Sequence, residues 1–171
     1  MNPEQYTVKA HDAIQEAKDT AIRMGHAQVD GEHLHLALVV QPDGLIPKLL
    51  STLGQDPAAI ARDIEAELAR QPKVSGGGAN LYASRRLSEL LLAAEDEAGR
   101  MKDEYVGVEH LYIALLKERK TPSQAILSRH GVTDEAFMAA LGKVRSNQRI
   151  TSQNPEDTYD TLQKYGRDLV D

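Results

Sequence analysis

The chain of 171 residues has no cysteine and no tryptophan, and it has only one phenylalanine and six tyrosines. Without cysteine, disulfides and thiolate metal sites are excluded within this chain. Aromatic residues make up 4% of the sequence although 41% is hydrophobic, so the core must be built from Leu, Ile, Val, Ala and Met. Such a mixture favours helices over sheets. We therefore expect an all-α protein.

The sequence also lacks a surplus of basic residues, a long apolar run and a leader peptide. Its net charge is -6 and its isoelectric point is near 5.5, whereas binding to a phosphate backbone requires a basic face. No stretch approaches the roughly 20 apolar residues that cross a bilayer, and the N-terminal sequence has no basic segment followed by an apolar one. We expect a cytoplasmic protein with neither nucleic acid nor membrane as a partner.

What the sequence does contain is an internal repeat. A shift of 77 positions aligns the first part of the chain with the second without a gap, and fifteen aligned positions are identical. The clearest match sets VDGEHLHLALV, residues 29–39, against VGVEHLYIALL, residues 106–116. Self-similarity at a fixed period is typical of a duplicated supersecondary unit. Because there are two copies, a pseudo-symmetric pair is favoured over a solenoid, which needs at least three.

Each copy shows the hydrophobic periodicity of four helices. In the first copy Asn2 is a possible cap, Pro3 suits the first helical position, and the helix runs to Met24 and stops at Gly25. Gly54 and Gly131 stand at equivalent helix ends. The further helices are expected at 31–40, 45–53, 57–70, 84–101, 108–119, 122–130 and 134–145. The predicted fold is eight helices in two pseudo-symmetric four-helix repeats.

The repeats define the expected domain organisation. The first repeat covers residues 1–71, a glycine-rich connector covers 72–80, and the second repeat covers 81–146. Residues 147–171 begin as a polar segment with the composition of a flexible tether. A further helical pattern then starts at Pro155, with Asn154 as its cap. This last helix has no partner in the chain, so we expect it to be the first element of a module that the chain does not contain.

The repeated Glu-His pair is explained by the start of a helix. If Asp30 and Gly107 are the caps, an apolar residue precedes each cap and another follows four places later, which is the spacing of a hydrophobic staple. These pairs are Val29 with Leu34, and Val106 with Leu111. Glu32 and Glu109 then lie in the first turn, where the helix dipole favours a negative charge. The motif predicts a scaffold role for Glu32, His33 and His110.

The alternative is a metal or acid-base site. His33 and His35 are two positions apart, so on a helix their side chains diverge by about 200° and cannot share one ion. A small hydrolase would need His33 and Glu32 to converge with a further residue in a cleft. Neither the Gly-x-Ser-x-Gly elbow nor the phosphate loop ending in Gly-Lys-Ser/Thr occurs in the sequence. We expect a non-catalytic chain without a metal site.

Some apolar residues lie outside the main helical stripes. Val8, Ile22 and Leu92 fall on a second face of the two long helices. Either the two repeats pack against each other through this face, or it is an exposed apolar groove that binds a partner. Tyr82, Tyr105 and Val106 could line such a groove.

The duplicated Val-x-x-Glu-His-Leu-x-x-Ala-Leu helix, the four-helix repeat and the glycine-rich connector resemble the N-terminal domain of the Clp family of ring-forming ATPase chaperones. The resemblance covers residues 1 to about 146. The segment NPEDTYDTLQKYGRDLVD is similar to the start of the first ATPase module of the ClpB type, whereas the ClpA and ClpC types usually enter that module differently.

This resemblance implies substrate handling. The family's domain engages unfolded or aggregated polypeptide and passes it to an ATP-driven pore. A polar trio on its substrate-facing side matches Thr7, Asp103 and Glu109, and an apolar groove matches the neighbourhood of Leu91. With Leu92, Tyr105 and Val106, these residues form the expected substrate-binding site. The resemblance also implies a homohexamer with a DnaK-type chaperone partner for the full-length protein, whose missing modules bind ATP and Mg²⁺, and a monomer for this chain.

Three other functions stay open. The chain could be an adaptor-docking domain of a protease-coupled Clp ATPase of the ClpA or ClpC type, for which partner proteins would occupy the surface. A hydrolase would lose its activity when His33 is replaced, whereas a scaffold residue would cost stability alone. A structural spacer would have no affinity for peptides.

Overall fold

A computed structural model describes residues 3–74, 81–146 and 150–155. Within these ranges the first repeat contains the 3₁₀ turn η1 (Pro3–Gln5), α1 (Val8–Arg23), β1 (Gln28–Val29), α2 (Gly31–Val40), α3 (Leu45–Thr52) and α4 (Pro57–Ala69). The second contains β2 (Tyr82–Ala83), α5 (Arg85–Arg100), α6 (Val108–Lys117), α7 (Pro122–Arg129) and α8 (Asp134–Arg145). The predicted all-α fold of eight helices in two repeats is confirmed.

The first helix begins later than predicted. Pro3–Gln5 is a separate 3₁₀ turn, and α1 starts at Val8 with Thr7 as its cap. The Thr7 hydroxyl accepts a hydrogen bond from the Ala10 amide at 3.1 Å. The turn is separate from the helix because Tyr6 pairs with Val106 in a parallel β-bridge, which holds the chain extended between them. The predicted cap, Asn2, therefore lies five residues before the actual cap, Thr7.

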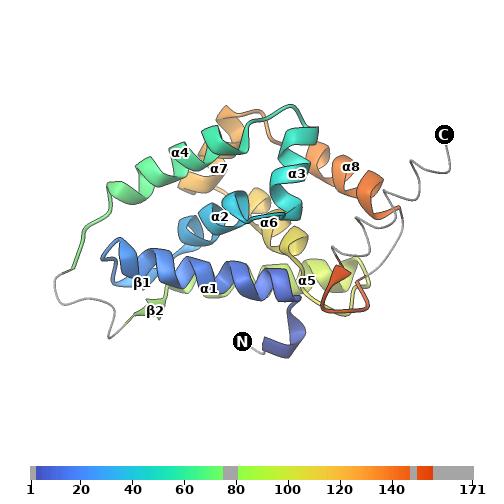
Figure 1. The fold of residues 1–171 in the computed structure, drawn as a ribbon, viewed down its shortest axis with the longest axis horizontal. Coiled ribbons are helices and arrows are strands. Elements are labelled where there is room, and N and C mark those ends of the chain that lie inside the picture. Colours follow the sequence, from blue (N-terminus) through green and yellow to red (C-terminus); the bar gives the residue numbers. More distant parts are fainter. Residues whose placement is uncertain (1–2, 75–80, 147–149, 156–171) are drawn as a thin grey trace.

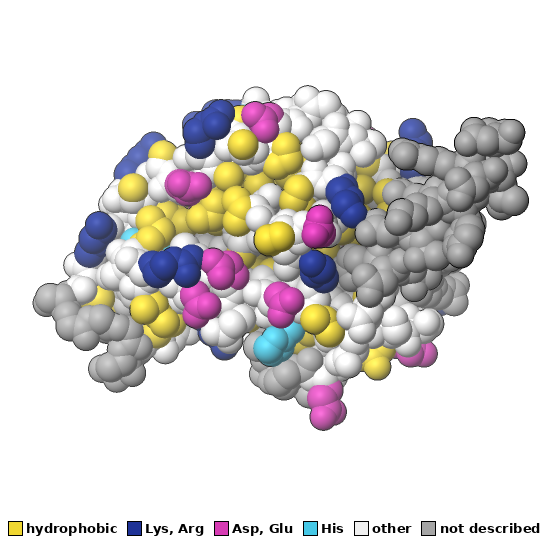
Figure 2. Space-filling model, in the orientation of Figure 1, with side chains coloured by type: hydrophobic (Ala, Val, Ile, Leu, Met, Phe, Trp, Pro, Cys, Tyr) yellow, Lys and Arg dark blue, Asp and Glu magenta, His cyan; other side chains and the backbone are white. Residues whose placement is uncertain are grey.

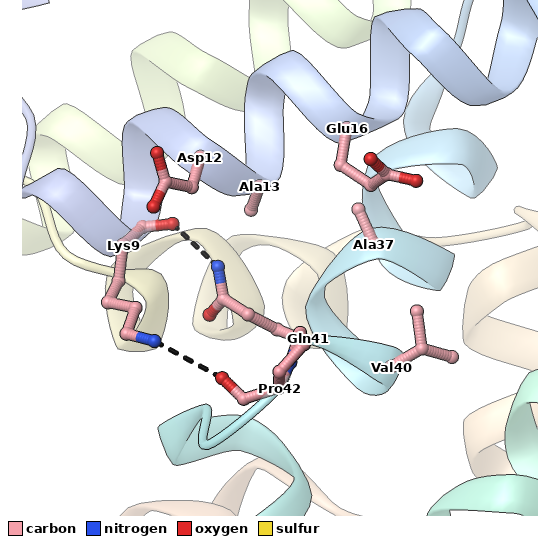
Figure 3. A pocket seen from close by; sticks show the side chains of 8 residues that line it. All are labelled: Lys9, Asp12, Ala13, Glu16, Ala37, Val40, Gln41 and Pro42. Atoms are coloured by element: carbon pink, nitrogen blue, oxygen red, sulfur yellow. Dashed lines mark hydrogen bonds between the residues drawn. The ribbon is translucent and has the colours of Figure 1, made fainter.

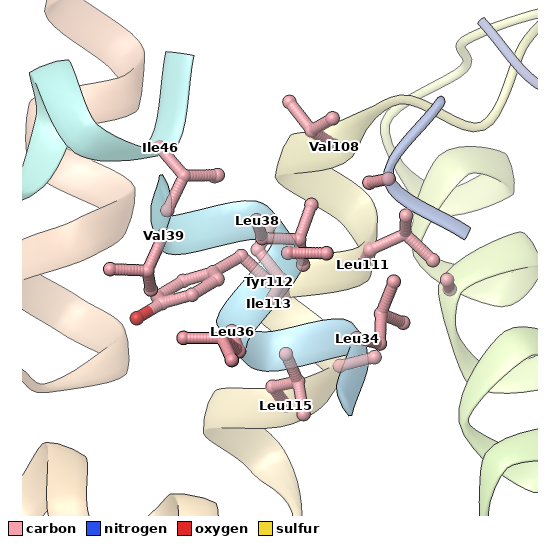
Figure 4. Packing of buried hydrophobic residues seen from close by; sticks show 14 of the residues in the cluster. Leu34, Leu36, Leu38, Val39, Ile46, Val108, Leu111, Tyr112, Ile113 and Leu115 are labelled. Atoms are coloured by element: carbon pink, nitrogen blue, oxygen red, sulfur yellow. The ribbon is translucent and has the colours of Figure 1, made fainter. Parts of the chain in front are cut away.

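The helices form three layers (Figure 1). The long helices α1 and α5 lie along one side, α3, α4, α7 and α8 lie along the other, and α2 and α6 lie between them. The two central helices are buried on nearly every side, and their apolar residues fill the core (Figure 4). Because α2 and α6 are the helices that carry the repeated motif, the duplicated sequence forms the centre of the molecule.

The two repeats are tied together by reciprocal backbone pairing. β1 of the first repeat pairs in parallel with β2 of the second, in the register Gln28 with Tyr82 and Val29 with Ala83. The equivalent contact in the other direction is the bridge between Tyr6 and Val106. The segment before each long helix is thus anchored to the loop of the other repeat, as expected for a pseudo-twofold arrangement.

The second apolar face of the long helices does not form this interface. The side chains of Val8, Ile22 and Leu92 remain 43%, 47% and 62% exposed. The prediction that the repeats pack through these residues is wrong, because the central helices and the short strands already join the repeats.

Other predicted segments lie outside the described residues. The glycines at 76–78 belong to the undescribed range 75–80, and the helix predicted from Pro155 falls largely in 156–171. The proposed segment boundaries remain predictions. No helix in the described part of the chain has the length and apolar character needed to span a membrane.

Candidate functional site

The repeated histidines hold the starts of α2 and α6. The Nδ1 atom of His33 accepts a hydrogen bond from the Asp30 amide at 2.9 Å, and Nδ1 of His110 accepts one from the Gly107 amide at 2.8 Å. Each imidazole therefore takes the place that Glu or Gln occupies in a capping box. The scaffold role predicted for these two histidines is confirmed, although the contribution of their rings to the cap was not predicted.

The other ring nitrogen of each histidine meets a different partner. Nε2 of His33 lies 2.8 Å from Nδ1 of His26, whereas Nε2 of His110 lies 2.7 Å from the carboxylate of Asp103. Burial and the neighbouring His26 lower the pKa of His33 to about 4. His33 is therefore neutral at pH 7, and its Nε2–H donates to His26.

Asp103 is the centre of a buried charge cluster. Its side chain is fully buried and accepts hydrogen bonds from both terminal nitrogens of Arg145, at 2.6 and 2.9 Å. It also accepts from His110 and, at 2.8 Å, from the Ile150 amide. Burial alone would raise the pKa of Asp103, but these donors outweigh it and lower the pKa to about 2.

Most members of the predicted substrate site are buried. Thr7 and Glu109 are 0% exposed, and Val106 is 4% exposed. The structure does bring them together, since the Thr7 amide donates to the Val106 carbonyl at 2.9 Å. Glu109 and Asp103 both form ion pairs with the guanidinium of Arg145. As the chain is folded here, a partner at the surface cannot reach the side chains of this trio.

An apolar groove lies beside Leu91, the residue near which the resemblance to the Clp N-terminal domain implies one. It has a volume of about 400 Å³ and runs between α1 and α5 next to the short strands. Its lining consists of Ile14, Ala17, Lys18, Val29, Leu34, Leu81, Tyr82, Ala83, Leu87, Ser88 and Leu91. Apolar side chains from both repeats thus form one concave surface, with Tyr82 57% exposed within its lining.

The remaining predicted residues lie outside this lining. Leu92 is adjacent to Leu91 in sequence but is not among the groove residues, because successive helical positions differ by about 100°. Tyr105 is half-buried and also absent from the lining. Ile14 and Leu87 were not predicted to line the groove, because their place in the ordinary core stripe gave no separate signal.

A second cleft lies between α1 and the end of α2 (Figure 3). It has a volume of about 510 Å³ and is lined by Lys9, Asp12, Ala13, Glu16, Ala37, Val40, Gln41 and Pro42. Lys9 donates to the Pro42 carbonyl at 3.1 Å, and Gln41 donates to the Lys9 carbonyl at 2.9 Å. Figure 2 shows hydrophobic side chains across the middle of the face that includes α1, with charged side chains around them. This cleft is more polar in its lining than the groove beside Leu91.

The hydrolase alternative requires His33 and Glu32 to meet in a cleft, and they do not. Glu32 is 1% exposed and accepts from Arg86 at 2.6 Å and from the Ser123 hydroxyl at 2.9 Å. Ser123 in turn lies 2.9 Å from His35, whose other nitrogen lies 2.9 Å from the Tyr112 hydroxyl. This buried chain of polar groups joins the two repeats.

The residues of this polar network are closed to solvent, since Ser123, His35 and Tyr112 are each 0% exposed. A substrate therefore cannot reach the Ser123 hydroxyl in this fold. In the described ranges 3–74, 81–146 and 150–155, no three His, Asp or Glu side chains are grouped to hold a metal ion.

Three residues with structural roles at these sites were missed by the sequence analysis. Arg86 and Arg145 lie on α5 and α8, and no spacing rule links them to their carboxylates. Ile150 did carry a signal, because it is a single branched apolar residue within the polar stretch RSNQRITSQN. Its side chain is 0% exposed.

The sequence matches known proteins over its whole length. The family model of the Clp repeat N-terminal domain matches residues 5–130. The chaperone protein ClpB of Nitratidesulfovibrio vulgaris is 46% identical over 178 residues, and that of Clostridium tetani is 37% identical over 174 residues. Each alignment covers 100% of this chain and 20% of the relative, so the chain spans about a fifth of the length of these curated relatives.

Solved structures share the fold. The Hsp104 N-terminal domain from Candida albicans has a TM-score of 0.79 at 20% identity, and the match covers 89% of this chain and 99% of that one. The N-terminal domain of ClpD from Arabidopsis thaliana has a TM-score of 0.62 at 22% identity, covering 84% of this chain and 96% of that one. A complex of the ClpV N-domain with a VipB peptide has a TM-score of 0.66 at 15% identity, covering 84% and 89%.

Proposed function

The chain belongs to the family of Clp repeat N-terminal domains, and on that premise we propose that it is the substrate-recognition domain of a ClpB-type ATP-dependent disaggregase. In this role it binds unfolded or aggregated polypeptide and delivers it to an ATPase ring. The assignment to the ClpB type rests on relatives of that name that match the whole chain.

The apolar groove beside Leu91 is the observation that carries this proposal. Its lining is dominated by Leu, Ile, Val and Ala side chains, and Tyr82 lies in it with more than half of its surface exposed. An open apolar surface binds segments that expose apolar side chains, because both surfaces leave water on contact. Unfolded chains expose such segments, whereas folded proteins bury most of them. The groove therefore supports selective binding of unfolded polypeptide.

Charge adds a preference to this selection. The net charge of -6 favours the approach of segments that carry Lys or Arg beside their apolar residues. Within the groove Lys18 and Ser88 are the polar side chains, and they can orient a peptide backbone. We expect the preferred ligand to be an extended or weakly structured segment that combines apolar and basic residues.

The properties of the full-length protein belong to the same proposal. We propose a homohexameric ring that binds ATP and Mg²⁺ in modules outside this chain, works with a DnaK-type chaperone and resides in the cytoplasm. The domain on its own is proposed to be a monomer that carries no catalysis.

Titration of the ¹⁵N-labelled chain with a short unstructured peptide rich in Leu, Val and Lys tests the proposal. We expect saturable amide shifts around Tyr82, Leu87 and Leu91. Leu91→Ser should weaken binding by about tenfold, because an apolar contact worth about 1.4 kcal/mol is lost. Leu92→Ser is the matched control, since its neighbouring side chain lies outside the groove, and it should bind like the wild type.

Thermal unfolding of both variants must first show that they remain folded. Equal affinities of the Leu91 and Leu92 variants would exclude this groove as the binding site. If Val40→Ser weakens binding instead, the peptide occupies the cleft beside Lys9, and docking of an adaptor protein becomes the better description. Absence of saturable shifts would leave a spacer role and contradict the proposal.

A further inference from the structure

The segment after the second repeat is bound to the domain. Ile150 donates its amide to Asp103 at 2.8 Å and accepts from the Glu104 amide at 2.8 Å. Three residues later, the Gln153 carbonyl accepts from the Val8 amide at 2.9 Å. A polar stretch that was predicted to be a flexible tether therefore makes three hydrogen bonds to the domain over residues 150–153.

The side chain of Ile150 is buried against Gly107. It is 0% exposed, and its Cδ1 atom lies so close to Gly107 that a Cβ atom at that position would be 2.9 Å away. A carbon–carbon contact of 2.9 Å is too short, and the same Cβ atom would come still closer to the Glu109 carboxylate, so a residue larger than glycine at this helix cap would require both side chains to shift. The absence of a side chain at Gly107 thus leaves room for the Glu109 carboxylate and for Ile150.

The first repeat also bonds its equivalent segment, since the Val74 amide donates to the Gly25 carbonyl at 2.8 Å, but it has no buried side chain at the position of Ile150. Its residue equivalent to Gly107 is Asp30, whose carboxylate caps α2 by accepting from the Gly31 amide at 2.8 Å. Its residue equivalent to Ile150 is Lys73, which is exposed. In the second repeat a glycine stands at the position of the side-chain cap, and the Glu109 carboxylate and the apolar Ile150 side chain lie next to it. This asymmetry is the reason to regard the contact as a built site.

The site also fits an extended polypeptide in general. It offers the amides of Glu104 and Val8 as donors, and the Asp103 carboxylate as an acceptor for a backbone N–H. The Val8 amide is a free donor of a helix N-terminus whenever the segment leaves. Backbone donors and acceptors around a pocket for a branched side chain are the elements by which proteins bind extended peptides.

The segment is also held weakly enough to leave. Residues 151–154 are exposed, so the apolar contact of the segment comes from Ile150 and, beyond Gln153, from the buried Pro155. Segments with few buried contacts open at a small fraction of the global stability. Opening would uncover the place where Asp103, Val106 and Gly107 meet, next to the otherwise buried trio of Thr7, Asp103 and Glu109.

We propose that Ile150–Gln153 is an intramolecular latch that occupies a peptide-binding site on the second repeat and is displaced by an extended polypeptide with a branched apolar residue. This inference rests on the proposed function and adds to it.

Hydrogen exchange of the ¹⁵N-labelled chain, with and without the same Leu, Val and Lys-rich peptide, tests the latch. In the wild type the Val8 and Glu104 amides should be protected. Ile150→Ser should speed their exchange by at least about tenfold, because the serine cannot fill the apolar space beside Gly107. Thr151→Ala changes the adjacent exposed residue and is the matched control, so it should exchange like the wild type.

Affinity for the peptide gives the second readout. If the latch competes with substrate, Ile150→Ser should bind up to about tenfold more tightly, since affinity is reduced by the fraction of molecules whose site is occupied. In the wild type, saturating peptide should speed exchange at the Ile150 amide.

Each contrary result has a distinct meaning. Unprotected Val8 and Glu104 amides in the wild type, or exchange unchanged by Ile150→Ser, would overturn the latch itself. Peptide binding through the Leu91 groove with the same affinity in Ile150→Ser would overturn the competition while leaving the proposed function intact. No binding by any variant would overturn the proposed function together with the competition.

Discussion

His26 and Asp103 occupy equivalent positions in the two repeats, and each lies against the same helix-capping histidine of its repeat. In the first repeat two imidazoles share one hydrogen bond, and burial keeps both neutral. In the second repeat a carboxylate replaces the imidazole. It accepts hydrogen bonds from Arg145 of α8 and from the Ile150 amide. One scaffold therefore carries a neutral pair at one end and a buried ion cluster at the other.

The backbone of the repeat is more constant than its chemistry. Thr7 and Ser84 cap the two long helices in the same way, by accepting from an amide three residues ahead, at 3.1 and 3.0 Å. His35 and Tyr112 are also equivalent, and they contact each other across the pseudo-twofold axis. Duplication therefore preserved the helix starts, while substitutions at a few buried positions gave the two halves different properties.

The largest loss of stability is expected on replacing Asp103, and it should exceed the loss on replacing its counterpart His26. Asp103→Ala leaves the Arg145 guanidinium buried without its main partner and should destabilise the domain by about 3–5 kcal/mol. His26→Ala removes a neutral hydrogen bond and should cost about 1–2 kcal/mol. Urea unfolding at pH 7 measures both. Equal losses would mean that the ion cluster is no more important than the neutral pair.

Acid should weaken the first repeat before it weakens the second. Burial lowers the pKa of His33 to about 4 and that of His35 to about 3, both from an ordinary value of 6.5. As the pH falls, the unfolded chain takes up protons before the folded one does. The free energy of unfolding is therefore at its full value above about pH 6.5 and decreases towards pH 4. Each histidine contributes a slope of about 1.4 kcal/mol per pH unit.

Between pH 7 and pH 5 we expect these two histidines to reduce the free energy of unfolding by about 4 kcal/mol, measured by urea unfolding at several pH values. The stabilisation by Asp103 is lost in a more acidic range. Its pKa is lowered from 3.8 to about 2, so this stabilisation disappears only as the pH falls through that range. His33→Gln keeps a capping-box side chain and removes one titrating group. An unchanged slope in this variant would contradict the assignment to His33.

A smaller effect is expected at the next pair of equivalent positions. Arg86 of α5 binds Glu32 at 2.6 Å and Glu118 at 2.8 Å, whereas its counterpart Lys9 donates only to a carbonyl at the rim of the second cleft. Arg86→Met should cost about 2 kcal/mol, because it leaves the buried Glu32 with only Ser123. Lys9→Met should change stability by less than about 0.5 kcal/mol. Similar values for both would remove the distinction between the repeats here.

The smallest effect concerns the backbone. Gly25 and Lys102 are equivalent, and both have positive φ angles, of 73° and 59°. Glycine adopts this conformation without strain, but lysine does not. Lys102→Gly should therefore stabilise the domain by about 0.5–1 kcal/mol, measured by thermal unfolding, and Gly25→Lys should destabilise it. A loss on Lys102→Gly would show that the lysine side chain contributes more than the strain costs.

The helices could be predicted because their signals are local. The caps at Asp30 and Gly107, the staples beside them and the stops at Gly54 and Gly131 all lie within a few residues of the element they define. The late start of α1 was missed because its cause is distant, namely the bridge from Tyr6 to Val106. Of the candidate site, Leu91 could be placed beside a groove, whereas the burial of Asp103 and Glu109 could not.

The duplication, the helices and the two copies of one capped helix could be read from the amino-acid sequence, because periodicity and capping act over short stretches of chain. Only the tertiary structure decided which polar residues are buried and what they bind. Asp103 meets Arg145 across 42 positions, Glu32 meets Ser123 across 91, and Ile150 returns to Gly107. Such pairings depend on how whole helices pack, and no local pattern specifies them.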